Sequence, residues 1–283
     1  MTKVVKAAVI VGLLGMVGVV GACAQPGPVT VRSYQPDDLV VRVEYIGGMR
    51  PTTDVLTDVP GVSVYGNGRV ISAGPVPAIY PGPALPNLQV SHISPQDVSY
   101  LVNLAVQAGV GKIADYGQPN IMDAPSTRVT VLIDGKRQVA TANALGMGDN
   151  DGQLTATQRK ARSDLRGLVD ALGYLPHTLG PLKVNQQEPY VATRVAVVAT
   201  PWTSPGENIP AQTEVGWPGP TLPGQPVARL NGLTCLTVTD ATAVLRAAAG
   251  ANRLTPWLDG GQRWTIAFRP LLPDETDCDD LGD

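Results

Sequence analysis

The chain has 283 residues, of which 43% are hydrophobic and 16% are charged, a composition that excludes an intrinsically disordered protein. Its formal net charge of −3 lacks the basic excess that contact with nucleic-acid phosphates requires, so we expect no nucleic-acid partner. The 31 glycines and 26 prolines exceed ordinary usage and predict many turns and much extended backbone.

The first segment has the pattern of a bacterial lipoprotein signal peptide. Lys3 and Lys6 precede an uncharged apolar run, residues 7–22, which is shorter than the roughly 20 residues that a membrane-spanning helix needs. Small residues then precede Cys23, an arrangement that resembles the lipobox, in which the cysteine thiol receives diacylglycerol and becomes the mature N-terminus. We therefore expect residues 1–22 to be a signal peptide and Cys23 to be lipidated. A plain secretory signal and an N-terminal anchor helix are the alternatives.

The expected anchor predicts where the protein is located. Two acyl chains on Cys23 suffice for stable attachment to a lipid bilayer, and residues 23–36 contain prolines typical of an extended tether. The folded part is then expected on the extracytoplasmic face of the cell membrane, which is an oxidising compartment. There Cys235 and Cys278 form an even pair and are expected to be disulfide-bonded. Two unrelated buried thiols are the alternative.

The folded part begins with a predicted strand from residue 39. Val41, Val43 and Tyr45 alternate with Arg42 and Glu44, which is the period of a strand with one face buried.

Two hairpins and two helices are predicted next. Asn67-Gly68 indicates a type I′ hairpin turn, and Asp134-Gly135 closes a second hairpin. Ser94-Pro95 caps a helix of about fifteen residues. Residues 155–158 form a capping box for another helix. On this helix the basic residues are expected to face solvent: Arg159, Lys160, Arg162 and Arg166.

The second half repeats the order of strand, proline-glycine loop, helix and strand in shorter form. We expect a polar connection over residues 175–188, a strand over 193–199, a threonine-capped helix over 237–249 and a strand over 263–268. The fold class is therefore predicted as α+β, with mainly antiparallel sheets and a few packed helices. Its domains are residues 37–174 and a second, smaller α+β domain, residues 188–283, closed by the disulfide.

Two proline-rich loops suggest that the halves are related. Residues 80–86 and 217–223 match at six of seven positions when tyrosine and tryptophan count as equivalent. A chance match in a proline-rich chain is the alternative.

Several stretches resemble a family of uncharacterised lipoproteins from high-GC Gram-positive (actinobacterial) bacteria. They are LVVRVEYIGG, SVYGNGRVI, YPGPALPNLQV, ADYGQPNIMDAPSTRVTVLIDGKRQV and RPLLPDETDC. The resemblance covers nearly the whole mature chain. The first half also resembles a small α+β unit with a glycine hairpin, a helix, an Asp-x-Pro segment and a hairpin closed by Asp-Gly. The resemblance implies a secreted lipoprotein of sheet-plus-helix architecture and carries no activity.

Common catalytic patterns are missing from the sequence. The only histidines, His92 and His177, accompany no Gly-x-Ser-x-Gly elbow, which disfavours a serine or cysteine hydrolase. No zinc-ligand spacing occurs, and residues 149–152 fit a calcium loop poorly. We expect no metal and no cofactor. The tail acids are interpreted as a solvated end rather than a weak calcium site: Asp274, Glu275, Asp277, Asp279 and Asp280.

Carboxylates and aromatic rings remain as candidate site residues. Glu44, Asp115 and Asp123 are acids that a glycan-processing enzyme would need in pairs, although Asp123 fits a turn better. Tyr80 and Trp217, in the matched loops, would suit a shallow binding surface, and Trp257 and Trp264 are further candidates of this kind. We expect Tyr80 and Trp217 instead to be buried against the prolines of their own loops.

Two function classes follow from these observations. The first is a non-enzymatic, lipid-anchored envelope protein that binds a protein or a wall component. The second is an envelope hydrolase or glycan-processing enzyme that uses aspartate or glutamate. A cleft with two carboxylates, at least one of them desolvated, would favour the enzyme.

Overall fold

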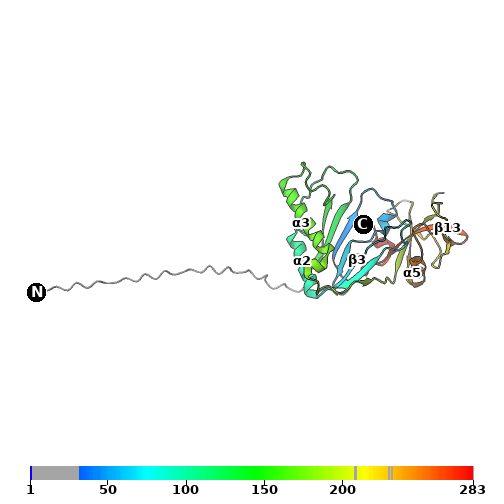
Figure 1. The fold of residues 1–283 in the computed structure, drawn as a ribbon, viewed down its shortest axis with the longest axis horizontal. Helices are drawn as coiled ribbons and strands as arrows, with labels where there is room; N and C mark the ends of the chain where they lie inside the picture. Colours follow the sequence, from blue (N-terminus) through cyan, green and yellow to red (C-terminus); the bar gives the residue numbers. More distant parts are fainter. Residues whose placement is uncertain (2–31, 207–208, 229, 231, 283) are drawn as a thin grey trace.

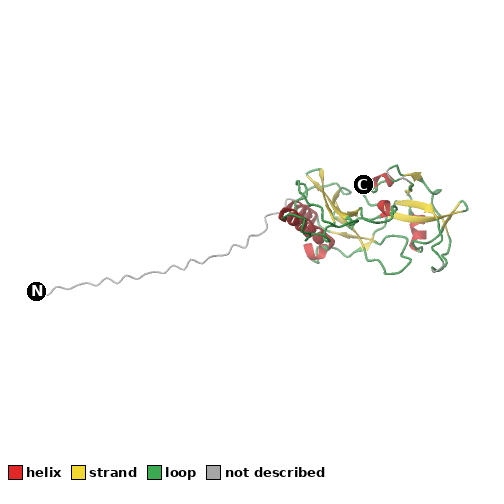
Figure 2. Ribbon diagram, turned by 90° about the horizontal axis from the view of Figure 1, so that it is seen from above, coloured by secondary structure: helices red, strands yellow, loops and turns green. Residues whose placement is uncertain are grey.

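The computed structural model of the protein describes residue 1 and residues 32–206, 209–228, 230 and 232–282. Within these ranges the chain forms two sheets of mainly antiparallel strands with helices packed on them, which confirms the predicted α+β fold class. The two sheets lie side by side along the long axis of the molecule (Figures 1 and 2). The expected lipidation site, Cys23, and all of the expected signal peptide except Met1 lie outside the described residues.

The first sheet has seven strands in the order β6-β5-β1-β2-β3-β4-β7, and every neighbouring pair is antiparallel. The strands are β1 (Leu39–Ile46), β2 (Val62–Tyr65), β3 (Arg69–Ala73), β4 (Leu88–His92), β5 (Ser126–Ile133), β6 (Lys136–Asn143) and β7 (Glu188–Pro189). The predicted alternation in β1 is observed for Val41 and Val43, which enter the helix-covered core, and for Arg42 and Glu44, which lie on the other face. Tyr45, which was predicted on the same face as Val41 and Val43, is instead 51% exposed and lies outside this core. Alternate residues of a strand thus serve opposite faces of this sheet.

Two long helices cover one face of the first sheet. They are α2 (Pro95–Gln107) and α3 (Ala156–Gly173), and both begin at the predicted caps. The Ser94 side chain accepts a hydrogen bond from the Asp97 amide, and Thr155 and Gln158 form the reciprocal capping box. The short helix α4 (Leu175–Leu179) follows α3 within the expected connection.

The second sheet has six strands in the order β10-β11-β8-β13-β12-β9. They are β8 (Val195–Pro201), β9 (Val215–Gly216), β10 (Gln225–Pro226), β11 (Thr234–Val238), β12 (Trp257–Asp259) and β13 (Gln262–Pro270). Helix α5 (Thr242–Ala249) packs on one face over a core that contains Trp217, Trp257 and Phe268. The short helix η1 (Cys278–Asp280) lies near the end of the chain.

Three segments cross between the two sheets. Helix α1 (Asp54–Thr57), from the first half, inserts Leu56 into the core of the second sheet. The loop after β3 adds Ala84 to the core beneath α5. Leu272, which follows β13 of the second sheet, packs among residues of the first sheet. The halves are therefore joined by an exchange of apolar side chains as well as by the chain itself.

Three local predictions need correction. The Asn67-Gly68 hairpin forms, but only Gly68 has a positive φ, so the turn is not type I′. Helix α5 begins at Thr242 rather than Thr237, because β11 extends through Val238. Arg162 was expected to face solvent but is fully buried, where it pairs with Asp149 and donates to the carbonyls of residues 116, 143 and 144.

No helix in the described ranges is long and apolar enough to span a membrane.

Candidate functional site

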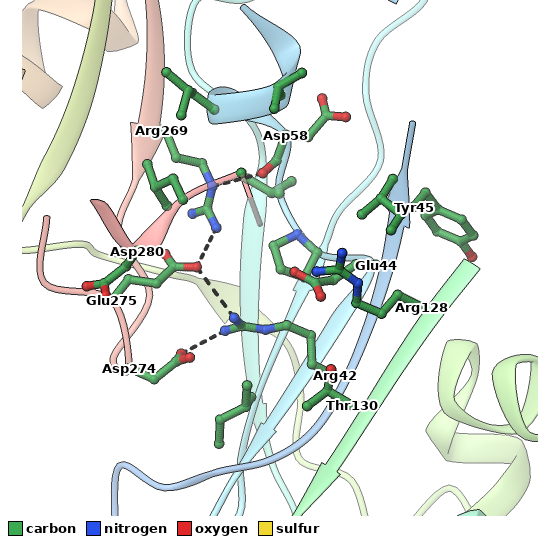
Figure 3. Close-up of a pocket in the computed structure, with 18 of the residues that line it drawn as sticks. Arg42, Glu44, Tyr45, Asp58, Arg128, Thr130, Arg269, Asp274, Glu275 and Asp280 are labelled. Atoms are coloured by element: carbon green, nitrogen blue, oxygen red, sulfur yellow. Dashed lines mark hydrogen bonds and ion pairs between the residues drawn. The ribbon is translucent and has the colours of Figure 1, made fainter. Parts of the chain in front are cut away.

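A charged cleft of about 550 Å³ opens on the face of the first sheet that α2 and α3 leave uncovered. One wall consists of side chains from β1, β5 and β6. The other consists of α1 and the segment that follows β13. Five arginines and six acidic residues line the cleft. Figure 3 shows the acidic side chains Asp274, Glu275 and Asp280 facing Arg42, Glu44 and Arg128 across it.

Strand register places the polar side chains of the sheet wall together. Glu44 of β1 pairs directly with Arg128 of β5, and Arg42 pairs with Thr130. Arg128 in turn lies opposite Thr141 of β6. Because directly paired residues share a face, these side chains form one continuous polar surface.

The opposite wall is held in place by the predicted disulfide. Cys235 of β11 is bonded to Cys278, with Cα atoms 6.1 Å apart, which confirms the expected pairing. The Cys278 amide adds a hydrogen bond that it donates to the Thr237 hydroxyl oxygen. The segment from Leu272 to Leu281 is thus fixed to the second sheet while it faces the first.

A buried ion network joins the two walls. Arg42 lies 2.7 Å from an Asp274 carboxylate oxygen, and the other terminal nitrogen of its guanidinium lies 3.6 Å from Glu275. Arg269 binds the same Glu275 oxygen at 2.7 Å. The second Glu275 oxygen accepts a hydrogen bond from the Leu272 amide, and Tyr65 donates to Asp274. Glu275 is only 4% exposed, so the expectation that it lies in a solvated tail was wrong.

The network fixes the protonation of its members. Burial, together with the nearby Asp274 carboxylate, raises the pKa of Tyr65, so the phenol remains a hydrogen-bond donor. Burial lowers the pKa of Arg42, but Asp274, Tyr65 and Glu275 outweigh it and raise the pKa overall. Burial lowers the pKa of Arg269, with a further contribution from Arg42. Both arginines nevertheless stay charged, because guanidinium groups do not deprotonate in proteins.

Glu44 differs from the other acids in the cleft. Burial raises the pKa of its carboxyl group, although Arg42 and Arg128 act in the opposite direction. Glu275 adds to the upward shift. Glu44 is therefore the cleft carboxylate whose charged form is disfavoured by its surroundings.

Several hydrogen-bonding groups of the cleft have no partner within the described ranges. The side chains of Arg137, Thr130 and Thr141 make no hydrogen bond or ion pair there. Thr141 lies opposite Arg128, Thr130 lies opposite Arg42, and Arg137 lies further along β6, opposite Leu132. The acidic groups at the bottom of the charged cleft are thus already paired with arginines, whereas hydrogen-bond donors on its sheet wall are not paired.

The acids proposed from the sequence are not brought together. Of the three, only Glu44 lines the cleft. Asp115 accepts hydrogen bonds from the Gly117 amide and the Gln158 side chain, which lower the pKa of its carboxyl group. Asp123 occupies a turn with φ of 58° and is exposed. Asp115 and Asp123 are therefore loop-forming residues.

The two aromatic candidates lie in different environments. Trp217 is 9% exposed and donates from its indole nitrogen to the Pro220 carbonyl, as expected for a residue that braces its loop. Tyr80 is 75% exposed, so the expectation that it is buried was wrong. Trp257 and Trp264 are buried in the second core.

The sequence analysis did not predict the ion network of the cleft, which is formed by Arg42, Arg269, Asp274 and Glu275. The only local signal was an arginine on the polar face of a strand. No group of three or more histidine, cysteine or acidic side chains in the described ranges is arranged to hold a metal ion.

A search for protein families, curated proteins and solved structures similar to this chain finds no match.

Proposed function

We propose that this protein is a lipid-anchored binding module on the extracytoplasmic face of the cell membrane, and that the charged cleft is its ligand site. The lipobox pattern at Cys23 and the resemblance to actinobacterial lipoproteins support the location. The disulfide is consistent with an oxidising compartment.

One observation favours binding over catalysis. Asp274 and Glu275, the acids at the base of the cleft, are each held by an arginine and by a further donor. These contacts hold both carboxylates in fixed positions. The base of the cleft is thus a fixed arrangement of charges, which suits recognition.

The cleft side chains that lack a hydrogen-bond or ion-pair partner in the described ranges suggest the kind of ligand. Arg137, Thr130 and Thr141 offer donors that suit a carboxylate. Glu44 would gain from a nearby cation, because burial raises the pKa of its carboxyl group. A ligand that carries both charges, such as a short peptide with an amine and a carboxylate, satisfies both requirements.

Calorimetric titration tests this proposal. The full chain, in a mild detergent, is titrated with the peptide Lys-Ala-Glu and with its uncharged counterpart acetyl-Ala-Ala-amide. We expect binding of the charged peptide only, weakened by added salt and by Arg137→Gln or Glu44→Gln. Equal binding of both peptides would contradict the proposal. Lys136→Gln, on the same strand but outside the cleft, is the matched control.

The enzyme alternative rests on Glu44. A carboxyl group with a raised pKa, in a cleft that also holds Glu275, is the arrangement a glycan-processing enzyme requires. Hydrolysis of a chromogenic glycoside by the full chain, lost in Glu44→Gln, would favour this alternative.

The anchor has its own test. Cys23→Ala should abolish acylation and leave an unprocessed or shed protein. Mass spectrometry that finds a normal membrane-bound form without lipid on Cys23 would remove the anchor from the proposal.

A further inference from the structure

A second cavity of about 550 Å³ lies on the opposite, helix-covered side of the first sheet. Its floor includes Val62 of β2, Val70 and Ser72 of β3 and Ser91 of β4. Register places Val62 opposite Ser72, and Val70 opposite Ser91, so all four side chains share one face. We call this cavity the neutral pocket.

The walls of the neutral pocket come from the end of α3 and the chain that follows it. Leu172 and Leu175 provide apolar surface, and the extended connection over residues 184–187 forms the remaining wall. The Asn185 amide donates to the His92 carbonyl, which fixes this connection along β4.

The neutral pocket has no charged lining residue. None of its fifteen lining residues is an aspartate, glutamate, lysine, arginine or histidine. The charged cleft on the other face of the same sheet has eleven charged residues, namely five arginines and six acids. A charged ligand would therefore find no counter-charge in the neutral pocket.

Polar groups of the neutral pocket retain unused hydrogen-bonding capacity. Ser91 is only 4% exposed, yet its hydroxyl has no hydrogen-bond partner in the described part of the chain. The same holds for the Ser72 hydroxyl and for the side-chain amides of Asn185, Gln186 and Gln187. The Ser91 oxygen is not among the fully enclosed side-chain atoms that lack a partner, so it is open to the cavity. A hydroxyl that faces a cavity with unused hydrogen-bonding capacity can bind a ligand that hydrogen-bonds.

An aromatic ring completes the lining. Tyr174 is 64% exposed, and its ring stacks on His177 with centroids 6.3 Å apart and an angle of 12° between planes. The ring therefore combines an accessible flat surface with a neighbour that limits its orientation.

We propose that the neutral pocket binds an uncharged carbohydrate of one or two rings. Hydroxyl and amide groups of a sugar match Ser72, Ser91 and the amide side chains, while its apolar face matches Val62, Val70 and the Tyr174 ring. The cavity volume lies within the range of about 300–1,000 Å³ that is usual for small-molecule sites.

An acyl chain fits the same volume less well. It would remove the hydroxyl and amide groups from water without giving them a partner. Each such unpaired group weakens binding by roughly five- to a hundredfold. The polar lining therefore favours the carbohydrate over a lipid chain.

The test uses the full chain in a detergent without a sugar headgroup, titrated with N,N′-diacetylchitobiose and followed by calorimetry and saturation-transfer NMR. We expect weak, salt-independent binding. Ser91→Ala should weaken it by about three- to tenfold, the value of one hydrogen bond. Tyr174→Ala, at an exposed position, should also weaken it without affecting the fold.

Ser163→Ala and Gln153→Ala change an exposed serine and an exposed glutamine outside the pocket and should leave binding unchanged. Absence of binding, or wild-type affinity in both Ser91→Ala and Tyr174→Ala, would overturn the proposal. So would displacement of the disaccharide by decanoate, because the occupant would then be an acyl chain.

Discussion

The charged cleft and the neutral pocket have the same volume, about 550 Å³, and lie on opposite faces of one sheet. The difference between them arises partly from alternation along the strands. In β1, Val41 and Val43 lie on the neutral face and Arg42 and Glu44 on the charged face. A shift of one residue in register would exchange the two faces.

The elements that cover the two faces differ as well. The neutral face is closed by α2, α3 and the connection over residues 172–187, none of which belongs to the second sheet. The charged face is closed by a segment 232 positions further along the chain, as the bond from Arg42 to Asp274 shows. The charged cleft therefore depends on the contact between the two halves, whereas the neutral pocket depends on the first sheet and the segments that cover it.

The largest expected effect is loss of an acid from the buried network. Glu275→Leu leaves Arg42 and Arg269 buried without their shared partner. Removal of one member of a buried pair costs about 3–5 kcal/mol of unfolding free energy. Urea denaturation should detect this loss, and Arg269→Met in addition should restore part of it.

The exposed pair Lys160–Asp164 provides the matched control for this measurement. Its side chains are 75% and 39% exposed, so Lys160→Ala should change stability by less than about 1 kcal/mol. Equal effects of Glu275→Leu and Lys160→Ala would contradict the structural role assigned to the network.

Reduction of the disulfide should have a comparable but more selective effect. Its closure of a loop with a sequence separation of 43 contributes on the order of 4 kcal/mol in the chain-entropy model. Because Cys278 holds one wall of the charged cleft, mild reduction should weaken peptide binding and spare disaccharide binding. Loss of both ligands together, while the fold remains intact by circular dichroism, would show that the two sites are not independent.

The smallest expected effect concerns pH. Because the pKa of Glu44 is raised above its ordinary value of 4.5, the folded state holds this proton more tightly than the unfolded state. Stability should therefore fall as pH rises from about 4.5 through the folded-state pKa, and Glu44→Gln should remove that fall.

Asp115 should have the opposite effect on how stability depends on pH. Its pKa is lowered below the ordinary value of 3.8, so it stabilises the fold above that pH and this contribution is lost as pH falls. Asp115→Asn should therefore destabilise the protein at neutral pH. Thermal unfolding of both variants across acidic pH distinguishes the two signs, and an unchanged profile in both variants would contradict the assignments.

Local features were predictable from the sequence. The caps of α2 and α3, the hairpin at Asp134-Gly135 and the two faces of β1 depend on residues close together in the chain. The disulfide was also predictable, because only two cysteines remain once Cys23 is assigned to the lipid.

The sites themselves were not predictable in this way. Glu275 has the appearance of a tail acid until the fold brings it to Arg42 and Arg269. The helical periodicity places Arg162 on the solvent-facing side of its helix. In the structure its guanidinium is buried, where it pairs with Asp149 and donates hydrogen bonds to three backbone carbonyls. Both cases depend on contacts between distant segments, on which helical or strand periodicity carries no information.

The central claim is that the charged cleft binds a ligand whose cationic group lies at Glu44. The most direct test is an NMR titration of the Glu44 carboxyl group in the full chain, with and without the peptide Lys-Ala-Glu. We expect a pKa above the ordinary value in the free protein and a lower pKa with the peptide bound, because the lysine ammonium stabilises the carboxylate. An ordinary pKa in the free protein, or a raised pKa that the bound peptide leaves unchanged, would contradict the account.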